Sequence, residues 1–203
     1  MNTNKILAYN FKHIACTRMH SNERLHGVFH SNGLIYASNG HVLTRTPFDY
    51  PEQLEGKTTA KDGSIITAGQ GVPFESVIPK GLLITNDGVD RKNFIRVIDK
   101  ANRIHKALHK EFGRNLYVKI DNMMFSMSVI KKLQGWLKHV KEEFVFTGSK
   151  NTLVVKSTAS DALGVALGMW HDNGSSYPHG ATVMTLLEVN DCLLSELMES
   201  YRD

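Results

Sequence analysis

The chain has 203 residues, of which 41% are apolar, and carries a formal net charge of +4 with a sequence pI near 9.0. This composition is typical of a globular protein with a hydrophobic core, in one large domain or two small ones. It has no run of about 18 apolar residues and no sustained apolar N-terminal segment, which argues against a membrane span or a secretion signal and favours a cytoplasmic location. The cysteines Cys16 and Cys192 form no CxxC pair, so we expect free thiols.

The first 48 residues predict a helix followed by an antiparallel meander. Residues 5–16 place apolar side chains at near-helical spacing, and strands are expected at 25–30, 34–38 and 41–46. Asn32-Gly33 and Asn39-Gly40 separate the strands, and Asn-Gly favours type I′ hairpin turns because both residues accept positive φ. His41 follows the second turn, and we expect its imidazole to satisfy buried backbone groups there.

The next 66 residues divide into an irregular part and a long helix. Residues 49–80 are rich in Gly, Pro and Thr, and only "SIITA" has the character of a strand. From Phe94 to Phe112, apolar residues recur every three or four positions, which predicts an amphipathic helix that ends at Gly113. Seven cations lie in this helix, against the acids Asp99 and Glu111: Arg91, Lys92, Arg96, Lys100, Arg103, Lys106 and Lys110. The segment is therefore a candidate basic face.

The remainder predicts a strand, a second helix, three strands and a last helix. "NLYVKI" has the pattern of a strand, and a helix begins at Ser126 or Ser128 with an apolar stripe from Val129 to Val140. Its lysines are free to face solvent: Lys131, Lys132, Lys138 and Lys141. "EFVFTG", "TLVVKS" and "ALGVALGMW" are expected strands, and the apolar spacing between 184 and 201 predicts an amphipathic helix whose polar side is acidic.

Residues 25–46, "LHGVFHSNGLIYASNGHVLTRT", resemble a segment of the bacterial DNA sliding clamp, the ring-forming beta subunit of the replicative polymerase. In that family a strand reading roughly Leu-Asn-Gly-Val-Xaa-Phe precedes Ala-Thr-Asp-Gly-His-Arg-Leu. The positions that match are Leu25, Gly27, Val28, Phe29, Ala37, Gly40, His41 and Leu43. Ser38, Asn39 and Val42 depart from the pattern, and Val42 removes a cation that the family carries.

Two further segments extend the resemblance to about half of the chain. "VPFESVIPK", residues 72–80, is similar to the family's connector between clamp domains, with Pro73, Phe74, Val77 and Pro79 retained in altered order. Residues 117–170 resemble the second half of a clamp domain, although Gly168 stands where the family has a proline. The resemblance implies an α+β fold of antiparallel sheets with helices packed on one face. We expect this domain at 1–175, with an insertion carrying the basic helix at 49–114, and an acidic amphipathic helix at 176–203.

The resemblance also implies a function without chemistry. Clamps hold duplex DNA by neutralising phosphates and do not read bases, so we expect a bacterial protein of DNA replication that binds DNA non-specifically. The candidate DNA-binding residues are Arg91, Arg96, Lys100, Arg103, Lys106, Lys110, Lys131, Lys132, Lys138 and Lys141. Family members join three such domains in a chain and close a ring from two chains. Because this sequence holds one such domain, a ring requires a homo-oligomer, and a monomer or dimer is the alternative.

Clamps also bind short peptides of polymerases in an apolar pocket beside their final strand, which corresponds here to Leu167, Met169 and Trp170. A polymerase-like or other protein partner is therefore expected. An alternative is a small interaction adaptor that reuses the clamp fold without binding DNA. A third hypothesis, a metal-dependent enzyme or hydrolase, depends on the spacing of His13, Cys16 and His20, which lacks the tight pairing of zinc sites. The sequence has no Walker loop, and we expect neither a cofactor nor a metal.

Overall fold

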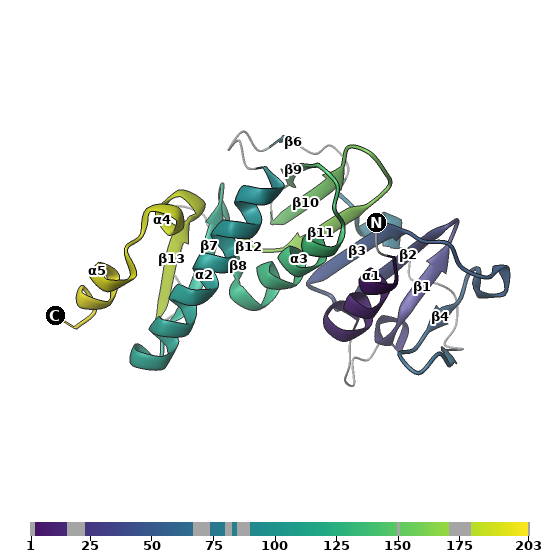
Figure 1. Cartoon of the computed structure of the whole chain (residues 1–203), viewed down its shortest axis with the longest axis horizontal. Coiled ribbons are helices and arrows are strands. Elements are labelled where there is room, and N and C mark those ends of the chain that lie inside the picture. The colour runs from purple at the N-terminus through teal and green to yellow at the C-terminus, as the bar shows by residue number, and fades with distance from the viewer. Residues whose placement is uncertain are drawn as a thin grey trace.

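The computed structural model describes residues 3–15, 23–66, 74–79, 83–84, 90–149, 151–170 and 180–202. In these residues the chain is an α+β protein with two sheets and helices packed on one face, as the sequence predicts (Figure 1). A nine-stranded sheet, here sheet A, has the order β5-β4-β1-β2-β3-β11-β10-β9-β6. A four-stranded sheet, here sheet B, has the order β12-β8-β7-β13. None of the helices in these ranges is long and apolar enough to cross a lipid bilayer.

The elements follow one another from an N-terminal helix to a pair of short C-terminal helices. The helices are α1 (Thr3–Tyr9), the π-helical η1 (Asn10–Ile14), the 3-10 turns η2 (Glu23–His26), η3 (Glu52–Leu54) and η4 (Phe74–Val77), then α2 (Arg91–Phe112), α3 (Met127–His139), α4 (Leu186–Asp191) and α5 (Leu194–Glu199). The strands are β1 (Val28–Ser31), β2 (Leu34–Ser38), β3 (Val42–Pro47), β4 (Thr58–Thr59), β5 (Ile65–Ile66), β6 (Leu83–Ile84), β7 (Asn115–Ile120), β8 (Met123–Ser126), β9 (Phe144–Ser149), β10 (Thr152–Ser157), β11 (Leu163–Leu167), β12 (Met169–Trp170) and β13 (Ala181–Thr185).

Sheet A joins two stretches that are far apart in the sequence. The meander β1-β2-β3 pairs through β3 with β11, in a register that places Leu43 opposite Val165. The first Asn-Gly turn has the expected geometry, because Asn32 and Gly33 both have positive φ, at 53° and 71°. Strands β4, β5 and β6, which belong to the segment 49–114, extend the same sheet at its two ends.

The second Asn-Gly turn differs from the expectation. Only Gly40 has positive φ, at 84°, and Gly40 and His41 occupy the two central positions, as in turns that require glycine first. The side chain of Asn39 satisfies the turn, because its Oδ1 accepts from the N–H groups of His41 at 3.0 Å and Val42 at 2.9 Å. The prediction that the His41 imidazole satisfies buried backbone groups is therefore wrong, and the ring is exposed.

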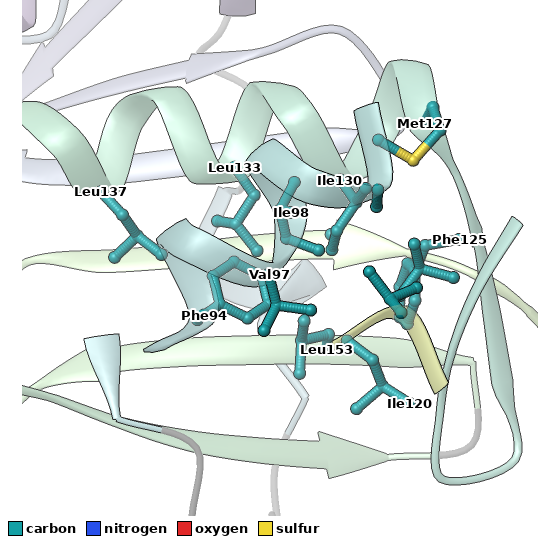
Figure 2. Close-up of a cluster of buried hydrophobic side chains, with 14 of the residues drawn as sticks. Phe94, Val97, Ile98, Ile120, Phe125, Met127, Ile130, Leu133, Leu137 and Leu153 are labelled. Carbon is teal, nitrogen blue, oxygen red and sulfur yellow. The ribbon is translucent and has the colours of Figure 1, made fainter. Parts of the chain in front are cut away.

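The main core lies between helices α2 and α3 and the strands beneath them. Figure 2 shows Ile98 of α2 beside Ile130 and Leu133 of α3, and Phe94 and Val97 of α2 nearer to Leu153 of β10, with side chains of β7 and β8 completing the cluster. Helix α2 ends as its sequence predicts, at Gly113, whose φ is 64°. It begins after Asp90, whose side chain accepts from the Asn93 N–H at 2.7 Å. Burial of this apolar stripe fixes α2 against α3.

The C-terminal segment differs from the single helix that its spacing predicts. Residues 181–185 form β13, which pairs in parallel with β7, the one parallel pairing among the described strands. Two short helices follow, and Val189 of α4 and Met198 of α5 enter the main core. Thr185 and Glu188 form a capping box that starts α4 and ends the strand. Cys192, between the helices, is a free thiol, whereas Cys16 lies outside the described residues.

Candidate nucleic-acid interface and apolar cavity

Three helices lie side by side over one face of the molecule, with α3 between α1 and α2 (Figure 1). Helix α1 contacts α3 through Tyr9, whose hydroxyl donates to the Lys132 carbonyl at 3.0 Å. The Tyr9 ring fits there because Gly135 of α3 has no side chain. Helix α2 contacts α3 through Gln134, whose Nε2 donates to the Ile95 carbonyl at 2.7 Å. The three helices, together with η1, therefore form one continuous surface, here called the helical face.

The helical face has few acidic residues. Helices α1 and α3 and η1 contain none, and α2 contains Asp99 and Glu111. Both are already paired, Asp99 with Lys138 at 2.8 Å and Glu111 with Arg202 at 3.3 Å. Although burial opposes it, the hydrogen bond from Lys138 holds the pKa of Asp99 below its ordinary value, so this carboxylate stays charged. The face therefore keeps a strong excess of positive charge.

Four of the predicted DNA-binding cations have contacts inside the chain. The Arg91 guanidinium donates to the Leu137 carbonyl from Nε at 3.0 Å and from Nη2 at 2.9 Å, which joins the start of α2 to the end of α3. Lys100 Nζ donates to the Asn190 carbonyl at 2.6 Å and holds the end of α4. Lys138 pairs with Asp99 as above. Arg96 donates to Asn93 within α2 at 2.7 Å, yet remains exposed.

The other six predicted cations are directed to solvent. Arg103, Lys106, Lys110, Lys131 and Lys141 are exposed and Lys132 is half-buried. Among the described residues, the side chains of these six have no hydrogen bond or ion pair, so their charges are available to an external anion. The sequence could not separate these six from Arg91 and Lys100, because the acceptors of Arg91 and Lys100 come from residues 46 and 90 positions away.

An apolar cavity of about 210 Å³ lies on the opposite face of sheet A. Residues alternate along β10 and β11, so Leu153 and Ala166 enter the main core beneath the helices whereas Val154 and Val165 face away from it. The cavity is lined from four separate segments by Leu25, Ser38, Gly40, His41, Val42, Leu43, Phe74, Val77, Val165 and Leu167. Its rim exposes Val77 and Leu167, at 60% and 40% of their surfaces.

The structure places only one of the three predicted peptide-binding residues at this cavity. Leu167 lines it, whereas Met169 belongs to β12 in sheet B, opposite Met124. The backbone of Trp170 pairs with Met123, and its side chain lies outside what the structure describes. Sequence analysis missed His41 and Phe74 as lining residues. The Asn-Gly-His hairpin and "VPFESVIPK" both resemble clamp segments, but no local sequence signal indicates that they line the same cavity.

One ionic cluster fixes η4 at the cavity. Glu75 Oε1 accepts from Arg45 Nη1 at 2.9 Å and from the Tyr36 hydroxyl at 2.7 Å. Burial acts against ionisation of Glu75, but these hydrogen bonds hold its pKa below the ordinary value. Phe74 is buried and stacks on Tyr36, with ring centroids 5.4 Å apart and planes 14° apart. This cluster thus orients the wall of the cavity that η4 supplies.

The described residues give no support to the hypothesis of a zinc site. Cys16 and His20 lie outside them, and His13 is the one member of the predicted spacing that is described. In the ranges that the structure covers, no group of three His, Cys, Asp or Glu side chains is arranged to hold a metal ion.

The arrangement of two sheets, with helices over one face and a cavity on the other, is that of a sliding-clamp-like fold, as comparison with solved structures shows. The DNA polymerase III subunit beta of Pseudomonas aeruginosa aligns with a TM-score of 0.53 at 14% identity, over 83% of this chain and 65% of that one. The sliding clamp of Bacillus subtilis gives 0.52 at 16% identity, over 84% and 63%. A Bartonella birtlesii clamp bound to griselimycin gives 0.53 at 12% identity, over 83% and 64%.

These similarities concern the fold, because every identity is far below the level that would indicate function. The chain spans less than two thirds of the length of each of these clamp subunits. No protein-family model matches the sequence, and no curated protein is similar to it.

Proposed function

We propose that this protein is a non-enzymatic, clamp-like protein of bacterial DNA replication, which binds duplex DNA without sequence preference through the helical face. The observation that carries the proposal is the charge of that face: its two carboxylates are paired, five predicted cations on its helices are not paired, and Lys141 follows the end of α3. Lysine and arginine in such a surface neutralise phosphates and release counterions, which supplies affinity without reading bases. The clamp-like fold supports this function, and a homo-oligomer is part of the proposal.

A salt series with a labelled duplex tests the proposal. Binding measured by fluorescence anisotropy is expected to weaken steeply as salt rises, and Lys131→Glu is expected to reduce the slope of log K against log salt by about 1. The matched control is Lys156→Glu, an exposed lysine of β10 on the side of sheet A away from the helices. Equal loss in both variants would mean that net charge, and not the helical face, determines binding. Absence of duplex binding at low salt would reject the function.

The cavity supports a second candidate, an interaction adaptor that docks an apolar peptide or a similar compact ligand. Its walls are almost entirely apolar, and Leu167 and Val77 leave apolar surface at the rim for a partner to cover. Because the cavity and the helical face lie on opposite sides of sheet A, a partner in the cavity does not compete with a duplex on the helices. Docking at the cavity is therefore compatible with duplex binding, and the adaptor candidate differs from the first in that it binds no DNA.

Griselimycin, the compound bound to the Bartonella birtlesii clamp, is a suitable probe of this cavity. We expect calorimetry to detect binding to the unmodified protein, and Leu167→Asp to weaken it by at least about tenfold, because a carboxylate then replaces buried apolar contact. Met169→Asp is the control: Met169 is 42% exposed against 40% for Leu167, but does not line the cavity. Equal weakening by the two variants would place the probe elsewhere, and no binding would remove the support from this candidate.

A further inference from the structure

A second cationic cluster lies where α1 and η1 contact α3, apart from most of the predicted DNA-binding residues. Its centre is Tyr9, whose ring centroid is 4.7 Å from that of His13 on η1 and 5.1 Å from that of His139 at the end of α3. The close approach is possible because Gly135 has no side chain: a Cβ there would lie 1.9 Å from the Tyr9 hydroxyl oxygen. Both imidazoles therefore lie against one ring, and neither is buried.

The charges that act on these two imidazoles are all positive. Among the described residues, Lys12 of η1 and Lys132 and His139 of α3 act on His13, and Lys5 of α1 acts on His139. Burial is the largest cause that lowers the pKa of His13, and these cations lower it further. Burial is also the largest cause that lowers the pKa of His139, and the charge of Lys5 adds to it. Tyr9 contributes no charge, since burial raises its pKa to about 12. Both histidines therefore hold a proton less readily than an ordinary imidazole does.

An anion at this helix contact would reverse the balance. It would offset the positive charges of Lys12 and Lys132, and it would accept hydrogen bonds from imidazolium groups, which favours protonation of both rings. We propose that the contact between α1 and α3 is a phosphate-binding site in which His13 and His139 take up protons when the phosphate binds. The inference rests on the proposed function where the phosphate belongs to duplex DNA, and it then makes binding by the helical face depend on pH.

The direction of that dependence follows from the linkage of protons and phosphate. Above the pKa values of the bound state neither ring is protonated, and affinity does not change with pH. As the pH falls between the bound and the free pKa values, binding takes up protons and becomes tighter. If phosphate raises the pKa of each ring by about one unit, the gain in affinity approaches about tenfold for each histidine as the pH falls below the free pKa values.

Two measurements test the site separately from the function. The first follows the imidazole C–H resonances of the full chain by NMR during pH titration, with and without inorganic tripolyphosphate. We expect this anion to raise the apparent pKa values of His13 and His139 and to leave that of His30, which is buried on β1, unchanged. If tripolyphosphate does not raise the values for His13 and His139, the site does not exist, whatever the outcome with DNA.

The second measurement compares duplex affinity at pH 8 and pH 5.5 at constant ionic strength. His13→Gln with His139→Gln is expected to reduce the pH dependence to less than about threefold, since these two rings supply the protons. The matched control, His109→Gln, changes an exposed histidine of α2 and should keep the full dependence. Persistence of the dependence in the double variant would overturn the inference and leave duplex binding intact, whereas absence of duplex binding at both pH values would overturn the proposed function.

Discussion

Replacing Trp136 with alanine is expected to lower the free energy of unfolding by about 3–5 kcal/mol, the largest loss from any single substitution considered for this chain. Trp136 is fully buried on α3, and its Nε1 donates to the Thr46 hydroxyl of β3 at 3.1 Å. Its ring meets Phe144 of β9 edge to face, with centroids 5.6 Å apart. One side chain thus joins the central helix of the helical face to strands on both sides of β11.

The size of this effect comes from packing as well as from the hydrogen bond. Gly164 of β11 leaves the space for the indole, since a Cβ there would be 2.9 Å from Trp136 Cζ3. Alanine at position 136 leaves a cavity between α3 and sheet A, and the close-packed surroundings fill that cavity only partly. Urea denaturation followed by far-ultraviolet circular dichroism measures the loss. A loss below about 1 kcal/mol would show that α3 is not held by this residue.

A second variant separates the two contributions. Thr46→Val removes the hydroxyl that accepts from the indole and keeps the ring, so we expect a loss of about 1–3 kcal/mol, because the indole N–H is then buried without a partner. If this variant were as unstable as Trp136→Ala, the hydrogen bond and not the packing would account for the attachment of α3 to sheet A.

The elements that were predicted correctly are those whose determinants are local. Helix α2 has its capping aspartate, its apolar stripe and its terminal glycine within one continuous segment, so its limits could be read from the sequence. The Asn32-Gly33 turn is likewise fixed by two adjacent residues. The resemblance to a clamp domain placed the stretches on both sides of 49–114 in one domain, but it did not predict the pairing of β3 with β11, whose paired residues are at least 118 positions apart (163 and 45).

The elements that were missed depend on distant partners. Residues 181–185 have spacing compatible with a helix, but they pair in parallel with β7, and that pairing is not encoded within the segment. In the second Asn-Gly turn, the Asn39 side chain takes the backbone donors that His41 was expected to satisfy, and the imidazole is left at the mouth of the cavity. Similarly, Arg91 and Lys100 resembled their exposed neighbours because their acceptors belong to α3 and α4.

Reversing one charge on each of the two contacting helices is expected to give the largest loss of duplex binding. Arg103 of α2 and Lys131 of α3 are both exposed, and each acts on a group in the seam between these helices, Arg103 on Asp99 and Lys131 on His105. If one duplex covers both helices, each reversal removes a phosphate contact and adds a repulsive charge. We expect Arg103→Glu with Lys131→Glu to weaken binding about a hundredfold at 50 mM salt and to reduce the salt slope by about 2.

The control variant reverses the charge of two lysines that lie outside the helical face. Lys61 lies in the turn before the edge strand β5, and Lys156 lies on β10, on the side of sheet A away from the helices. Lys61→Glu with Lys156→Glu is expected to weaken binding less than about threefold, because only long-range repulsion remains and salt screens it. The single variants complete the cycle: if the effects of Arg103→Glu and Lys131→Glu multiply in the double variant, the two side chains contribute to binding independently. If the double variant bound no more weakly than Lys131→Glu alone, α2 would lie outside the interface, and the proposed surface would be limited to α3 and its contact with α1.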